Sequence, residues 1–166
     1  MGWLWSFNSL SLVLLVLAAW RWGAGPERAC VAALVFMNLG ELVYHGIFSR
    51  PALYATVDLV HLFLDVTVAA VFVGVALKAN RLYPLWLAAF QLVSVISHFT
   101  REASAAVGKI PYALLMQAPY YLVILVLAAG IWLHARRMKL YGPYRSWRSS
   151  SNPLRTPSMH VRPPTG

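Results

Sequence analysis

Five long apolar runs dominate this sequence, separated by short connections that contain glycine, proline or charged residues. The runs cover residues 3–19, 29–48, 52–77, 84–100 and 111–133. A helix needs about 20 mostly apolar residues to cross the hydrocarbon core of a bilayer. The composition agrees, since 60% of the 166 residues are hydrophobic and 11% are charged, whereas soluble domains carry about 25% charged residues. The sequence therefore predicts an all-α integral membrane protein, with five transmembrane helices forming one domain, residues 1–139.

The remaining segment, residues 140–166, is rich in serine, proline and arginine and has no apolar periodicity. Such a segment buries too little apolar surface to offset the entropy lost on ordering. We therefore expect a disordered basic cytoplasmic tail whose Lys and Arg side chains lie on anionic lipid headgroups. A solvated tail without lipid contacts is the alternative.

Lys and Arg residues divide unevenly between the two sides of this predicted bundle. If the C-terminus is cytoplasmic, only three of them lie on the outer side: Arg50, Arg101 and Lys109. The positive-inside rule therefore favours an outer N-terminus and a cytoplasmic C-terminus. We predict a multi-pass protein of the plasma (inner) membrane. This distribution also accounts for the net charge of +9, so the bilayer is the expected partner and nucleic acid is not.

Polar side chains concentrate in the outer half of the predicted bundle. They share helical faces at a spacing of three or four residues, in three sets: Asn38, Glu41 and His45; Asp58, His61 and Asp65; and Gln91, Ser94, His98 and Arg101. The inner halves of the helices are almost wholly apolar. A channel or proton path needs polar groups along its whole length. The pattern instead predicts a pocket that opens toward the outer face and is closed below.

Three carboxylates and three imidazoles in this region are candidate metal ligands: Glu41, His45, Asp58, His61, Asp65 and His98. Such mixed sets bind zinc, manganese or non-haem iron, and helical bundles build these sites from facing helices. We therefore predict a buried carboxylate–histidine pocket that binds a divalent transition metal. A metal-bound water beside a spare carboxylate base would make the protein an enzyme.

Two other interpretations of the same residues stay open. In the first, the polar residues are contacts between helices: Glu41 or Asp58 pairs with Arg101, and His98 bonds to a neighbouring helix. The protein would then be an accessory or assembly subunit of a larger membrane complex. In the second, His61 and His98 hold a b-type haem, or a quinone binds near His98 and Arg101. The single cysteine, Cys30, excludes an internal disulfide and a multi-cysteine zinc site.

Overall fold

The computed structural model describes residues 2–47, 59–100 and 109–148. These residues form five α-helices, in the order α1 (Gly2–Trp22), α2 (Gly25–Ile47), α3 (Leu59–Lys78), α4 (Tyr83–Thr100) and α5 (Lys109–Tyr141). The described residues contain no strand beyond one isolated bridge between Ala79 and Trp147. The prediction of an all-helical chain is thus confirmed.

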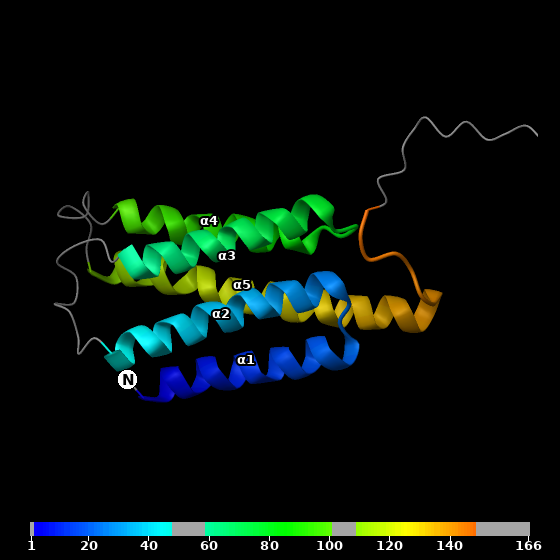
Figure 1. Ribbon diagram of the computed structural model, residues 1–166, viewed down its shortest axis with the longest axis horizontal. Coiled ribbons are helices and arrows are strands. Elements are labelled where there is room, and N and C mark those ends of the chain that lie inside the picture. Colours follow the sequence, from blue (N-terminus) through cyan, green and yellow to red (C-terminus); the bar gives the residue numbers. More distant parts are fainter. Residues whose placement is uncertain (1, 48–58, 101–108, 149–166) are drawn as a thin grey trace, which may run out of the picture.

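The helices run side by side along the long axis of the molecule (Figure 1). One end, called here the N-end, holds the amino terminus and the last residues of α2 and α4. The opposite C-end holds the α1–α2 turn, the α3–α4 connection and the chain that follows α5 (Figure 1). Helix α4 packs between α3 and α5, while α2 packs against α1 and α3.

The bundle is apolar both inside and outside. Each helix sends one large side chain into a shared core: Leu15, Leu34, Phe72, Leu87 and Leu127 are all at most 5% exposed. Each helix also presents large apolar side chains outward: Leu14, Leu39, Phe63, Trp86 and Leu125 are 53–64% exposed. A soluble bundle would carry polar residues on that outer surface. An apolar exterior around an apolar core is typical of a bundle in lipid.

Three of the helices are long and apolar enough to cross a membrane: Gly25–Ile47, Leu59–Lys78 and the Gln117–Tyr141 part of α5. The described parts of the other two, Phe7–Trp22 and Tyr83–Phe99, are apolar but shorter. The described residues therefore contain three candidate membrane spans, whereas the sequence predicts five.

The chain after α5 differs from the expected disordered tail. Helix α5 continues to Tyr141, where Gly142 adopts φ 77° and donates its N–H to the Met138 carbonyl at 3.1 Å. This is a left-handed helix cap that glycine adopts without strain. Residues 142–148, called here the C-terminal strap, then fold back onto the α3–α4 connection. Residues 149–166 lie outside the described part of the chain.

Backbone hydrogen bonds and the Trp147 side chain hold the C-terminal strap in place. Its backbone makes two hydrogen bonds, Asn80 N–H to the Ser146 carbonyl (3.1 Å) and Arg148 N–H to the Lys78 carbonyl (2.8 Å). Trp147 packs so closely on Gly25 that a Cβ there would lie 2.7 Å from the indole Nε1. A low average hydropathy over residues 140–166 conceals these individual anchors, which explains the incorrect expectation for residues 140–148.

Candidate functional site

Polar residues of α3 and α4 meet in the half of the bundle nearer the N-end. The Asp65 carboxylate on α3 accepts a hydrogen bond from Gln91 Nε2 at 2.7 Å through Oδ1. Its Oδ2 lies 2.8 Å from His98 Nε2. Gln91 and His98 are seven residues apart on α4, so two helical turns place them on the same face. Both are at most 7% exposed. The two oxygens of Asp65 therefore each have a partner on the neighbouring helix.

A ring cluster of α2 and α3 completes this polar region. The His45 and His61 ring centroids are 5.4 Å apart, and Tyr44 meets His61 edge-on at 5.3 Å. Glu41, one turn before His45, interacts electrostatically with His61 and Asp65. We call Glu41, His61, Asp65, Gln91 and His98 the N-end cluster. Hydrogen bonds join its members on α3 and α4, and its α2 member, Glu41, lies near them.

The six candidate metal ligands are only partly covered by the described residues. Asp58 and Arg101 lie outside the described residues, and with them the six-ligand site as a whole and the Arg101 pairings. Within residues 2–47, 59–100 and 109–148, no group of three or more His, Cys, Asp or Glu side chains is arranged to hold a metal ion. Metal binding is thus unsupported by the described residues and stays a prediction. For a haem iron, His98 would have to release the Nε2 contact with Asp65.

A second polar cluster lies at the C-end, where the sequence indicates an apolar half. Glu27 on α2 is fully buried and forms an ion pair with Arg81 of the α3–α4 connection. The same carboxylate oxygen accepts a hydrogen bond from the Tyr83 hydroxyl at 3.0 Å. The other oxygen accepts the Ala24 N–H at 3.0 Å, as a carboxylate in the first turn of a helix commonly does. Glu27 thereby connects α2 with α4 and with the loop before it.

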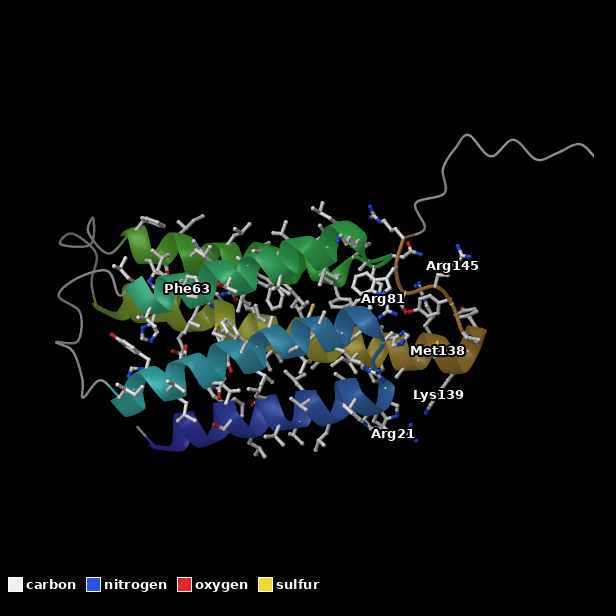
Figure 2. All side chains as sticks on the ribbon, in the orientation of Figure 1. Arg21, Phe63, Arg81, Met138, Lys139 and Arg145 are labelled. Atoms are coloured by element: carbon white, nitrogen blue, oxygen red, sulfur yellow. The ribbon has the colours of Figure 1, made fainter. Side chains whose placement is uncertain are left out.

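The C-terminal strap closes over this ion pair. Arg81 donates from Nη2 to the Ser146 hydroxyl at 3.2 Å, and its Cζ lies 5.3 Å from the Tyr144 ring centroid. Tyr144 is held by a 2.8 Å hydrogen bond between its hydroxyl and Nδ1 of His134. Figure 2 shows Arg81 at this end of the bundle, near the strap and the end of α5. Burial acts to lower the pKa of the Arg81 guanidinium, but this group stays charged in proteins.

Sequence reasoning did not identify this C-end cluster. The site predicted from the sequence includes neither Glu27 nor His134, which is 5% exposed. One signal was available, because Glu27 is an acidic residue in a region otherwise populated by Lys and Arg. Its partner is 54 residues away in the chain, a separation that no local pattern reveals.

Among the described residues, the N-end cluster lines neither of two surface cavities. An apolar groove of about 240 Å³ lies between α2 and α3, bordered by Ala29, Ala33, Phe36 and Val68 among others. A second cavity of about 400 Å³ lies at the C-end, lined by Arg137, Tyr141 and Tyr144. No family model, curated protein or solved structure matches this chain.

Proposed function

We propose that the chain is a five-span protein of the plasma (inner) membrane, with the N-end outside and the C-end in the cytoplasm. Helices α1 and α4, of 21 and 18 residues, rise about 1.5 Å per residue and reach roughly 27–32 Å. That length matches a hydrocarbon core of about 30 Å. Every described Lys and Arg except Lys109, the first residue of α5, belongs to the C-end. This asymmetry supports the cytoplasmic placement of that end.

Within that membrane setting, we propose that the protein is an accessory or assembly subunit of a larger membrane complex. The observation that carries this proposal is the pairing of both Asp65 oxygens with Gln91 and His98. A carboxylate bonded in this way holds α3 against α4 through both of its oxygens. The outward apolar side chains of all five helices offer surface to lipid or to partner helices.

Replacement of Asp65 tests whether the N-end cluster is a set of contacts between helices. Asp65→Asn can still accept from Gln91 and donate to His98, so we expect only a small loss of stability, about 0.6 kcal/mol. Asp65→Leu removes the carboxylate partner of both side chains and leaves Gln91 only its 3.5 Å bond to the backbone carbonyl of residue 65, which costs about 1–3 kcal/mol. Thermal unfolding of the purified variants in detergent measures the difference. Both variants should still enter the native complex, as judged by cross-linking in intact membranes.

The same preparations distinguish this role from a metal or haem site. An accessory subunit contains no stoichiometric zinc, manganese or iron and shows no Soret band. Near-stoichiometric metal that disappears in Asp65→Asn or His61→Ala, with the fold retained, would establish the metal site instead. A chain that is found in native membranes without any partner would overturn the accessory role.

A further inference from the structure

The cavity at the C-end is a cationic site that the role proposed above does not use. Its three lining residues come from two segments. Arg137 and Tyr141 are one turn apart on α5, and Tyr144 belongs to the C-terminal strap. The cavity of about 400 Å³ therefore exists because the strap folds back beside the end of α5.

Two guanidinium groups share the Tyr144 ring at this cavity. The Cζ atoms of Arg81 and Arg137 lie 5.3 Å and 5.5 Å from its centroid. Glu27 neutralises Arg81. Arg137 has neither a hydrogen-bonding nor an acidic partner within the described residues. Among the described residues, Arg137 thus places at this cavity a positive charge that no acidic side chain matches.

The Tyr144 ring, against which Arg137 lies, is held in place by its own contacts. The Tyr144 hydroxyl is held by His134 at 2.8 Å, and the strap that carries Tyr144 is bonded to Lys78 and Asn80. Arg81 is 6% exposed, and its Nε is buried without a hydrogen-bond partner. The Arg81 guanidinium, which is paired with Glu27, therefore also lies against this ring. The exposed Arg137 guanidinium thus lies against a ring that is already held in place, which lowers the entropic cost of ordering the site around a ligand.

The surroundings identify the level of the bilayer at which this cavity lies. Trp132 and Tyr141 are 60% and 82% exposed, and Arg136 lies over the Trp132 ring at 5.6 Å. Exposed aromatic residues beside basic ones are typical of the level of the lipid headgroups. Arginine binds phosphate through two parallel hydrogen bonds, and basic pockets between helices on the cytoplasmic side bind anionic headgroups.

We propose that the Arg137–Tyr141–Tyr144 cavity binds the phosphate group of an anionic phospholipid of the cytoplasmic leaflet. The inference rests on the membrane orientation proposed above but not on the accessory role. This proposal assigns one lipid-binding site of defined stoichiometry, whereas the sequence predicts diffuse attraction of anionic headgroups along the tail. A free phosphate ion has the same binding chemistry and differs only in its source.

The test is native mass spectrometry of the detergent-purified full chain titrated with phosphatidylglycerol, phosphatidylcholine or inorganic phosphate. We expect one phosphatidylglycerol to bind more tightly than phosphatidylcholine, without competition from inorganic phosphate. Arg137→Gln should weaken that first binding step about fivefold, equivalent to about 1 kcal/mol. Arg137→Lys keeps the charge but loses the paired donors, so it should also weaken binding.

The neighbouring arginine supplies matched controls. Arg136→Gln and Arg136→Lys change the same charge and the same side-chain shape outside the cavity, and they should weaken the first binding step less than the Arg137 variants do. Equal losses at both positions would mean general electrostatic attraction and would overturn the proposal. Binding of inorganic phosphate in place of lipid would overturn the lipid source. Thermal unfolding of each variant confirms that its fold is intact, and the measurement needs no partner complex, so it can fail independently of the accessory role.

Discussion

Glu27 and Asp65 are acidic residues of the bundle whose partners differ in charge. Asp65 faces an amide and an imidazole, so its contacts resemble ordinary hydrogen bonds between helices. Glu27 faces the permanent charge of Arg81 and is fully buried. Removing one member of a buried ion pair costs far more than losing one neutral hydrogen bond, because the other charge is left without compensation.

Glu27→Gln should therefore destabilise the protein by about 3–5 kcal/mol, since Arg81 remains charged and buried. The measurement is the free energy of unfolding in detergent. The double variant Glu27→Leu/Arg81→Met removes both charges and should recover most of that loss. Arg28→Gln is the control, because within the described residues the Arg28 side chain bonds to backbone carbonyls of α1 and to no acidic group. A Glu27→Gln protein as stable as the wild type would show that the pair does not stabilise the bundle.

The residues of the N-end cluster show which part of the site is predictable from the sequence and which part is not. The side chains at the N-end were found because they recur at helical spacing, and His98 does bond to a carboxylate on another helix. The partner itself was not predictable, since Asp65 and His98 are 33 residues apart. The spacing of polar residues shows which face of its own helix a side chain occupies. The residues that this face contacts depend on how the helices pack, here α3 on α4.

Among the elements, the helices were predictable and the C-terminal strap was not. The runs of apolar residues locate all five helices. They do not locate the helix ends, because a helix can continue past its last apolar residue. The fifth run was expected to stop at 133, and α5 continues through His134, Arg136 and Lys139 to Tyr141. Basic residues are good helix formers, so the helix extends beyond the apolar run. The strap depends on single contacts of Tyr144, Ser146 and Trp147, which composition does not report.

Gly25→Ala tests the packing of the C-terminal strap. The added Cβ would lie 2.7 Å from Trp147 Nε1, so the indole must move and the strap should loosen. We expect trypsin to cleave after Arg145 and Arg148 several times faster than in the wild type, because local opening exposes the backbone. Gly46→Ala is the control, since a Cβ at Gly46 meets nothing within 4 Å. Equal cleavage rates in both variants would mean that Trp147 does not secure the strap.

The whole molecule has one end rich in positive charge and one end with little. Among the described residues, this contrast follows the two ends of the bundle rather than any single helix. The sequence reveals it directly, because charge counting needs only the order of the helices. Hydropathy alone does not decide how many helices cross the bilayer, since three of them meet the length and composition required of a span.

Reporter fusions test the five-span arrangement. A fusion after Arg148 should be active only with a cytoplasmic reporter, and one between residues 103 and 108 only with an external reporter. The same holds for a fusion at the α1–α2 turn, which should report the cytoplasm if α1 spans the membrane. An external signal at that turn would remove α1 from the spans, and a reversed pattern throughout would invert the bundle.

The position of the strap has a consequence for the order of synthesis. Chains are made from the N-terminus at about 5–20 residues per second, so Glu27 and Arg81 are synthesised well before Tyr144 and Ser146 exist. Until the ribosome has passed residue 148, Arg81 lacks both its hydroxyl acceptor and the ring that covers it. A prematurely terminated chain would contain all five helices and still leave this charge partly uncovered. The last residues of the strap thereby distinguish a finished bundle from an interrupted one.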